Sequence, residues 1–438
     1  MGNFFCGVKK MKFQIYTLGC KVNAYESEMM KEKLLANGYI YDEEKPDIVL
    51  INTCSVTNTA DHKSLKMVRH FKRKNPLSTI VVCGCSVQNN SEAYEKEGVD
   101  ILLGNQKKSE IVDLLQNYFR TKEKFQYVSK ERKIPFEDMA ITKFTTHTRA
   151  FVKIEDGCDN FCSYCIIPYV RGSIRHKDFD LVLKEVETLV NNGHQEIVFT
   201  GIHTGSYFSN GHDLTDLIHE VSKLPLLKRI RISSIEVTEL QDKFLRELAN
   251  NPKICNHLHI PLQAGSNVIL EKMNRKYILD EYQEILRKIR EVRPDISIST
   301  DIIVGFPGET EALFEETLET AKRFQFSKIH VFPYSVREGT AASRMPLQID
   351  EAVKHERSKR LIDLSSRLEK EYAEKFLGHT LEVLVEKSGE ESIGTTSNYL
   401  KVKINENLSN NALVKVKILS YKNGILYGEL VKESLCAF

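Results

Sequence analysis

The chain has 438 residues, with 62 Lys and Arg against 60 Asp and Glu, which leaves a formal net charge of +2. Its 41% hydrophobic and 28% charged residues are ordinary for globular domains, which excludes a wholly disordered or fibrous chain. No apolar run approaches the roughly 18 residues of a membrane span, and the first residues lack a secretory signal. We therefore expect a cytoplasmic protein with no membrane partner and, by its length, about two to four domains.

The chain contains 10 cysteines. Cytosolic thiols stay reduced, so this number points to metal or redox chemistry rather than to disulfides. Met11 is a plausible alternative translation start, because the first strand-like run begins there. Cys6, Cys255 and Cys436 belong to no pattern, and we expect them to be structural or incidental.

The first part of the chain alternates strands with amphipathic helices. The expected strands are residues 13–18, 47–53, 79–84 and 101–103, and the expected helices are residues 26–37, 58–74 and 109–119. This alternation predicts an open, mostly parallel α/β sheet domain over residues 1–125. A charged stretch, residues 120–133, is expected to be a linker.

Residues 144–375 continue the strand–helix rhythm with longer units. The expected strands are residues 150–155, 196–200, 229–233, 257–261, 297–304 and 328–332, followed by a charged helix over 349–376. They predict a partial (β/α)6 barrel that binds ligands at the carboxyl ends of its strands. Residues 377–438 then show short alternating strands at 380–387, 399–405, 413–420 and 425–432, typical of a small all-β barrel.

Three cysteines, Cys158, Cys162 and Cys165, form a C-x3-C-x2-C motif directly after an expected strand. Three thiolates on one tight loop can bind three irons of a 4Fe–4S cluster and leave the fourth iron open. A structural zinc site is the alternative, but such sites take four protein ligands. The nearest further candidate is His176, which is too distant for finger spacing. The motif therefore predicts an open iron–sulfur cluster.

A second set of cysteines is scattered through the N-terminal domain. Cys20, Cys54 and Cys85 each follow the end of an expected strand, and the carboxyl ends of parallel strands share one edge of a sheet. We expect these three thiols to converge, although three separate buried cysteines are the alternative. Cys83 competes as the third ligand, but it lies inside an apolar run and is expected to be a core residue.

The C-x3-C-x2-C motif resembles that of radical S-adenosylmethionine (SAM) enzymes, and the two cysteine sets with a β-barrel resemble the methylthiotransferase family over nearly the whole chain. The resemblance implies a second 4Fe–4S cluster on Cys20, Cys54 and Cys85 and a C-terminal TRAM module that binds RNA. It also implies that SAM, bound at the open iron, is cleaved to a 5′-deoxyadenosyl radical. Members attach a methylthio group to unactivated carbon, and we expect a protein reductant and a sulfur source as partners.

Within that family, the sequence Gly-Cys-Lys-Val-Asn around Cys20 looks most like the branch that acts on threonylcarbamoyladenosine in tRNA. The expected function is therefore addition of a methylthio group to C2 of N6-threonylcarbamoyladenosine next to the anticodon. Isopentenyladenosine in tRNA and an aspartate of a ribosomal protein remain alternative substrates. A non-catalytic RNA-binding iron–sulfur protein is the alternative of a different class. Arg175-His176 departs from the family, which usually places Ser after the basic residue.

The resemblance, together with positions at strand ends, suggests residues that contact SAM. Tyr164 matches an aromatic that faces the adenine, Gly201 lets backbone approach the methionine amino group, and Glu236 can accept from ribose hydroxyls. The complete expected set is Tyr164, Thr200, Gly201, Glu236, Gln263, Arg275 and Asp301. For each of them a structural hydrogen bond or core position is the alternative.

The nearly neutral net charge gives no overall nucleic-acid footprint, so an RNA surface must be local. The helix expected at 58–74 has a basic stripe, and alternating lysines in the C-terminal domain point to one face of a strand. The expected RNA-binding residues are Lys63, Lys66, Arg69, Arg73, Lys401 and Lys403. A solvated charged face is the alternative, since residues 378–438 hold seven Lys and seven Glu.

Overall fold

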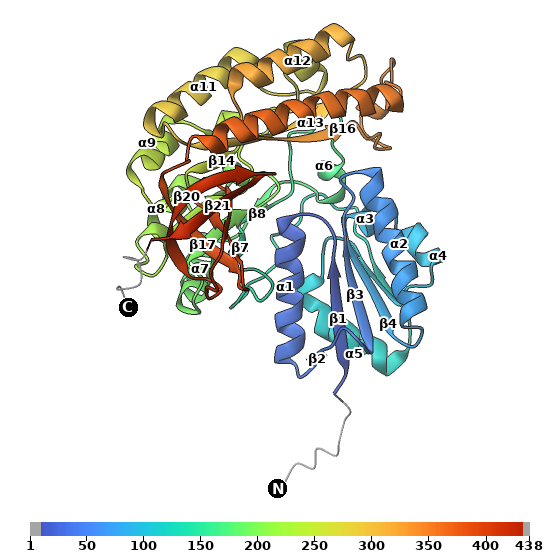
Figure 1. The fold of residues 1–438 in the computed structure, drawn as a ribbon. Coiled ribbons are helices and arrows are strands. Elements are labelled where there is room, and N and C mark those ends of the chain that lie inside the picture. The colour runs from blue at the N-terminus through green and yellow to red at the C-terminus, as the bar shows by residue number, and fades with distance from the viewer. Residues whose placement is uncertain (1–9, 432–438) are drawn as a thin grey trace. The chain divides into compact units, whose positions relative to one another are not determined.

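The computed structural model describes residues 10–431, and these residues form two compact units (Figure 1). Unit 1 contains the chain up to Thr142 together with the segments Asp156–Asn160 and Cys165–Arg175, and unit 2 contains the rest. Cys6 and Cys436 lie outside the described residues. Within residues 10–431, no helix is long and apolar enough to cross a membrane.

Unit 1 is built on a six-stranded parallel sheet, which confirms the predicted α/β domain. The strand order is β2-β1-β3-β4-β5-β6, and every neighbouring pair is parallel. The strands are β1 (Lys12–Thr17), β2 (Ile40–Tyr41), β3 (Ile48–Thr53), β4 (Thr79–Gly84), β5 (Ile101–Leu103) and β6 (Phe125–Tyr127). The order reverses between β1 and β3, and open α/β sheets bind their ligands at the carboxyl edge of such a point.

Helices lie on both faces of this sheet, as the fully buried strand β3 requires (Figure 1). The helical elements of unit 1 are α1 (Lys21–Ala36), α2 (Asn58–Lys74), α3 (Cys85–Asn89), α4 (Ser91–Lys96), η1 (Lys108–Glu110), α5 (Ile111–Thr121) and α6 (Ile167–Val170). Val68 and Phe71 of α2 pack with Val49 and Ile51 of β3 in one core cluster. Helix α2 begins where the sequence predicts, because the Thr57 hydroxyl accepts a hydrogen bond from the Ala60 amide at 3.1 Å.

Several expectations about unit 1 need correction. Helix α1 begins at Lys21 rather than at residue 26, because Cys20 has extended backbone and acts as its N-cap. The stretch expected to be a linker contains β6, which pairs with β5 at the edge of the sheet. The sequence analysis does not include β2, α3 or α4, because elements of two to six residues carry too little periodicity.

The centre of unit 2 is an open barrel of six parallel strands, which confirms the predicted partial barrel. Two three-stranded sheets, β13-β10-β7 and β14-β15-β16, are joined by parallel bridges from Ile230 to Ile254 and from Ser234 to His259. The strands are β7 (Ala150–Lys153), β10 (Glu196–Thr200), β13 (Arg229–Ile232), β14 (His257–His259), β15 (Ser297–Val304) and β16 (Lys328–Pro333). The helices are α7 (Phe179–Asn191), α8 (Leu214–Ser222), α9 (Asp242–Asn250), α10 (Asn267–Lys272), α11 (Leu279–Val292), α12 (Glu311–Phe324) and α13 (Glu351–Glu374).

The end of unit 2 is a closed five-stranded barrel with the order β17-β18-β19-β21-β20. Its strands are β17 (Thr380–Lys387), β18 (Ser392–Thr396), β19 (Lys401–Ile404), β20 (Leu413–Lys422) and β21 (Ile425–Leu430). The sequence predicts four of these strands and misses β18, whose central Gly394 interrupts the apolar pattern. A Cβ atom at Gly394 would lie 2.4 Å from the Leu384 carbonyl oxygen, so the close pairing of β17 and β18 depends on this glycine.

A buried ion-pair group joins the two barrels of unit 2 at the amino ends of β10 and β13. Glu196 pairs with Arg231 at 2.7 Å and with Arg229 at 3.6 Å. The Arg229 guanidinium also donates to the Thr395 carbonyl oxygen at 3.0 Å, and Arg231 lies 4.7 Å from the Tyr399 ring centroid. Charged side chains therefore connect the small barrel to the end of the large barrel that is opposite the expected ligand site.

Candidate functional site

Cys20, Cys54 and Cys85 lie at the carboxyl ends of three neighbouring strands of unit 1, next to the reversal point of the sheet. Cys20 is the N-cap of α1, Cys54 follows β3, and Cys85 is the first residue of α3 after β4. Burial, and then the neighbouring Cys85 and Cys20 thiols, raise the pKa of Cys54 to about 12. The structure thus brings together the three thiols that the sequence predicts to converge.

Two features of the loop before α1 set the position of Cys20. Gly19 has φ +108°, and a Cβ atom there would lie 2.8 Å from the Cβ of Cys54, so only glycine allows this approach. The Asn23 side-chain amide donates to the Leu18 carbonyl oxygen at 2.7 Å and to the Thr53 carbonyl oxygen at 2.9 Å. Asn23 therefore links the chain just after β1 to the last residue of β3, and these two segments lead into Cys20 and Cys54.

A buried guanidinium, that of Arg171, lies beside this group of thiols. Its side chain is 1% exposed and forms ion pairs with Glu26 at 3.0 Å and Asp156 at 2.9 Å. It also donates to the Asn23 side-chain oxygen at 2.8 Å. Burial lowers the pKa of Arg171, but Cys85, Asp156 and Glu26 outweigh it and raise that pKa well above its ordinary value. A permanent positive charge beside three soft sulfur donors suits an anionic, thiolate-bound iron–sulfur cluster.

Asn105 and Lys108 complete the surroundings of Cys85. The Asn105 side-chain amide donates to the Cys85 sulfur at 3.5 Å and to the Val170 carbonyl oxygen at 2.8 Å. Lys108, which is fully buried, forms an ion pair with Glu26 and also donates to Asn105 at 3.3 Å. Asn105 and Lys108 belong to no motif that the sequence shows.

Cys83 differs from the three converging thiols. It is fully buried within β4, and burial is the main reason that its pKa is raised to about 12. A fully buried cysteine inside a strand, such as Cys83, is poorly placed to bind a cluster at the carboxyl edge of the sheet. Its location agrees with the expectation that Cys83 is a core residue.

The C-x3-C-x2-C motif crosses the division between the two units, with Cys158 and Cys165 in unit 1 and Cys162 in unit 2. All three cysteines are partly exposed. A Cβ atom at Gly157, which has φ +88°, would lie 2.2 Å from the Ser173 carbonyl oxygen. The Cys158 amide donates to the Gly172 carbonyl oxygen at 3.1 Å, so two glycines shape the start of this loop.

Two predicted SAM contacts, Glu236 and Arg275, meet beside Cys162 in unit 2. They form an ion pair with each other, and Arg275 donates to the Cys162 sulfur at 3.4 Å. Burial lowers the pKa of Arg275, but Tyr277, Tyr164 and Glu236 outweigh it and raise that pKa well above its ordinary value. A charged, buried guanidinium therefore lies beside Cys162 of the C-x3-C-x2-C motif, as Arg171 lies beside the N-terminal cysteines. Tyr164 is near enough to Arg275 to affect its pKa.

The other predicted SAM contacts lie on the barrel strands or just after them, and Asp301 lies inside β15 rather than at its end. Thr200 ends β10, and a Cβ atom at Gly201 would lie 2.6 Å from a carboxylate oxygen of Glu155. That oxygen accepts from the Ile202 and His203 amides at 2.7 and 2.6 Å, and Glu155 is a residue that the sequence analysis misses. Gln263 has φ +68°, a left-handed backbone conformation that is uncommon for non-glycine residues. The Asp301 carboxylate pairs with His259 at 3.1 Å.

The predicted RNA-binding residues lie at the surface, with Lys403 half-buried. Lys63, Lys66, Arg69 and Arg73 are exposed on α2 of unit 1. Arg69 is paired with Glu97 at 2.6 Å, which offsets its charge. Lys401 and Lys403 lie on the outer face of β19, while Val402 and Ile404, which alternate with them, are buried. Lys403 is paired with Glu391.

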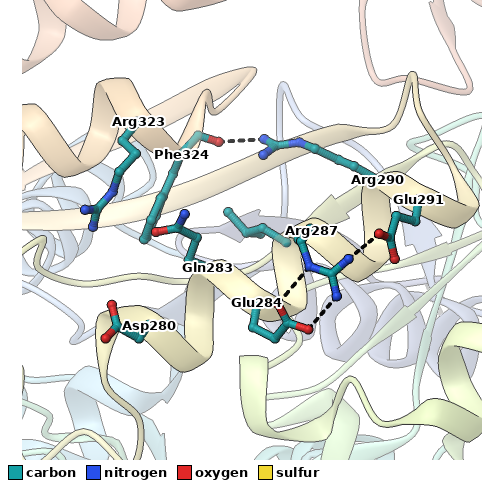
Figure 2. A pocket seen from close by; sticks show the side chains of 9 residues that line it. Asp280, Gln283, Glu284, Arg287, Arg290, Glu291, Arg323 and Phe324 are labelled. Atoms are coloured by element: carbon teal, nitrogen blue, oxygen red, sulfur yellow. Dashed lines mark hydrogen bonds and ion pairs between the residues drawn. The ribbon is translucent and has the colours of Figure 1, made fainter.

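A surface hollow of about 610 Å³ lies on unit 2 between α11 and the end of α12 (Figure 2). Arg287 pairs there with Glu284 at 2.7 Å and with Glu291, and Arg290 donates to the Phe324 carbonyl oxygen at 2.6 Å. The hollow is lined by α11, Arg323 and Phe324 and by no barrel strand. Its lining includes no cysteine and neither Glu236 nor Arg275.

Comparison with known proteins agrees with this geometry. Residues 152–321 match the radical SAM superfamily, and residues 12–104 match an uncharacterized protein family, UPF0004. The threonylcarbamoyladenosine tRNA methylthiotransferase MtaB of Bacillus subtilis is 43% identical over 94% of each chain. This chain belongs to the radical SAM tRNA methylthiotransferase family. The family uses SAM and two 4Fe–4S clusters, and the chain is an enzyme of this class.

Other relatives carry two different names. The threonylcarbamoyladenosine tRNA methylthiotransferase of Aquifex aeolicus is 37% identical over 90% of this chain and 96% of its own. The tRNA-2-methylthio-N(6)-dimethylallyladenosine synthase of Thermoanaerobacter sp. is 36% identical over 97% of this chain and 93% of its own.

Among solved structures, the radical SAM methyltransferase TsrM of Kitasatospora setae is similar with a TM-score of 0.55 and 12% identity, over 74% of this chain and 72% of its own. This likeness concerns the fold alone.

Proposed function

We propose that this methylthiotransferase adds a methylthio group to C2 of N6-threonylcarbamoyladenosine next to the anticodon of tRNA, in the cytoplasm. The observation that carries the proposal is the 43% identity over 94% of both chains to a relative named for that nucleoside. The motif around Cys20, which resembles the same branch, supports it. The dimethylallyladenosine enzymes are the second candidate, because a relative with that name is 36% identical over almost the whole chain.

The residues of this chain take three roles in the proposal. Cys158, Cys162 and Cys165 would hold the cluster that supplies the electron for SAM cleavage, while Cys20, Cys54 and Cys85 would bind the cluster that holds or supplies the sulfur. The SAM contacts are Tyr164, Thr200, Gly201, Glu236, Gln263 and Arg275. Lys63, Lys66, Arg73, Lys401 and Lys403 bind the RNA backbone. Arg69 contributes less because Glu97 offsets its charge. A protein reductant and a separate sulfur source complete the reaction.

The Glu236–Arg275 pair supports the SAM assignment. Arg275 is nearly buried, pairs with Glu236 and reaches the sulfur of Cys162 at 3.4 Å, so its three donor groups are directed at Tyr277, Glu236 and the cluster motif. It positions the Glu236 carboxylate beside the motif. A carboxylate held in this way can accept hydrogen bonds from the two ribose hydroxyls of SAM.

Nucleosides from the tRNA of a strain that lacks this gene test the substrate. Loss of the methylthio form of threonylcarbamoyladenosine, with unmodified threonylcarbamoyladenosine accumulating in its place, is the expected result. Loss of methylthio-dimethylallyladenosine instead would transfer the assignment to the second candidate. If both methylthio nucleosides persist, the substrate is not one of these two nucleosides. Restoring the gene with Cys162→Ala should leave the loss uncorrected, whereas the wild-type gene should restore the product.

A further inference from the structure

Unit 2 contains a group of metal-ligand side chains apart from both cysteine sets. His259 on β14, Asp301 on β15 and His330 on β16 come from three adjacent parallel strands. Asp301 is directly opposite His330 in the register of β15 and β16. One ligand atom from each of the three side chains lies within 4.8 Å of the other two. The shortest separation, 3.1 Å, joins Nε2 of His259 to Oδ2 of Asp301.

The ring of His259 is held in place by a contact at its second ring nitrogen, Nδ1. Nδ1 of His259 lies 2.9 Å from the Ser299 hydroxyl oxygen, which also lies 3.0 Å from Nε2 of His257. A hydrogen bond at Nδ1 fixes the ring so that Nε2 is directed at Asp301. When Nδ1 is the donor and the ring is neutral, Nε2 carries a lone pair that faces the carboxylate, and a cation between the two atoms would satisfy both. Metal-binding histidines typically have such a partner on the second ring nitrogen.

The outer side of the group is accessible. The side chains of His259 and Asp301 are 14% and 27% exposed, and His330 is exposed. β16 is the edge strand of its sheet, and its Phe332 is exposed as well. A ligand or ion can therefore approach from the open edge of the barrel while Ser299 supports the buried side.

We propose that His259, Asp301 and His330 bind a divalent transition metal ion such as zinc or iron(II). Two imidazoles and one carboxylate on one face form a three-ligand set that suits these metals and leaves coordination positions open. Magnesium and calcium are disfavoured because they prefer oxygen ligands. Asp301, which the sequence analysis places among the SAM contacts, instead supplies the carboxylate of this site.

The open positions suggest what the metal binds, and this step rests on the proposed function. A threonylcarbamoyl group ends in a carboxylate and a hydroxyl, which are hard oxygen donors for an open metal site. A dimethylallyl group has no such donor. The metal therefore binds the threonyl carboxylate of the substrate nucleoside and discriminates against the apolar side chain of the second candidate.

Metal binding is tested on the reconstituted holoenzyme after removal of loose metal with a chelator. Equilibrium dialysis against zinc should give one zinc ion per chain beyond the cluster iron. His330→Asn, an exposed position that should not affect folding, should weaken zinc binding at least tenfold, and so should Asp301→Asn. His219→Asn is the matched control, because His219 also faces a carboxylate, that of Glu247 at 3.4 Å, but belongs to no group of three metal-ligand side chains among the described residues. Absence of the extra zinc, or equal binding by all variants, would overturn the proposal.

The role of the metal is tested with anticodon stem-loop RNA. For RNA that carries threonylcarbamoyladenosine, chelated enzyme and His330→Asn should both show a KM raised at least tenfold, and zinc should restore only the chelated wild type. RNA in which the threonyl carboxylate is converted to an amide should show no dependence on zinc. An unchanged KM in chelated enzyme would refute the substrate role. If zinc-loaded wild type leaves this RNA unmodified, the proposed function itself fails, whatever the metal content.

Discussion

Arg171 is the residue whose replacement should most disturb the N-terminal cysteine site. Its buried guanidinium forms ion pairs with Glu26 at 3.0 Å and Asp156 at 2.9 Å and donates to Asn23 at 2.8 Å. Removing one partner of a buried ion pair typically costs about 3–5 kcal/mol, because a buried charge is left uncompensated. Glu26 keeps Lys108 and Asp156 keeps Arg175 as partners, so we expect about 3 kcal/mol for Arg171→Met.

Calorimetry of the reduced apoprotein measures this cost. For a unit of this size, about 3 kcal/mol corresponds to a melting temperature lowered by roughly 6–12 °C. Arg132→Met is the control within unit 1, since Arg132 is 44% exposed and its pair with Asp159 should contribute less than about 1 kcal/mol. Equal shifts in the two variants would show that Arg171 is not a stabilising charge and would refute the reasoning.

Three further predictions follow from the same structure. Cys85→Ala should abolish methylthiolation while reductive cleavage of SAM persists, whereas Cys83→Ala should keep both activities and lose about 1 kcal/mol of stability; the reverse pattern in product analysis would make Cys83 the third ligand. Replacing Lys63, Lys66 and Arg73 with Gln should weaken tRNA binding and flatten its salt dependence, whereas the triple change Lys359, Arg367 and Lys370 to Gln on α13 should not; equal effects in a salt titration would argue against an RNA surface on α2. Burial raises the pKa of Glu196, but Arg231 and Arg149 outweigh burial and lower that pKa, so the Glu196 carboxylate stabilises the fold above about pH 4.5 and this stabilisation is lost as the pH falls further. Glu196→Gln should therefore melt at a lower temperature at neutral pH and lose less stability on acidification. Parallel curves of melting temperature against pH for the two proteins would contradict this.

The sequence predicts the architecture because the periodic signals are long. Helix α2 and strands β4, β10 and β15 have the predicted bounds, and the alternation of strands with helices correctly implies a parallel sheet in unit 1 and a barrel of parallel strands in unit 2. The convergence of Cys20, Cys54 and Cys85 is predictable because the carboxyl ends of parallel strands share an edge. Strands β6 and β18 are missed because one lies in a charged stretch and the other contains Gly394.

The polar surroundings of the site are not predictable from the sequence. Arg171 contacts Glu26 and Asn23, which are 145 and 148 residues away in the sequence, and no local sequence pattern predicts such a contact. The same holds for His259, Asp301 and His330, which lie on three different strands and belong to no common sequence motif. Asp301 follows a strand pattern that suits a cofactor contact equally well, and only its 3.1 Å approach to His259 indicates another role.

The central claim is that this chain methylthiolates C2 of threonylcarbamoyladenosine by radical chemistry, and isotope transfer tests it most directly. The holoenzyme is given SAM, a reductant and a stem-loop RNA whose threonylcarbamoyladenosine carries deuterium at C2. The account predicts a methylthio product together with 5′-deoxyadenosine that contains one deuterium atom. A methylthio product formed without deuterium in 5′-deoxyadenosine, or no product from a preparation with both clusters intact, would contradict it.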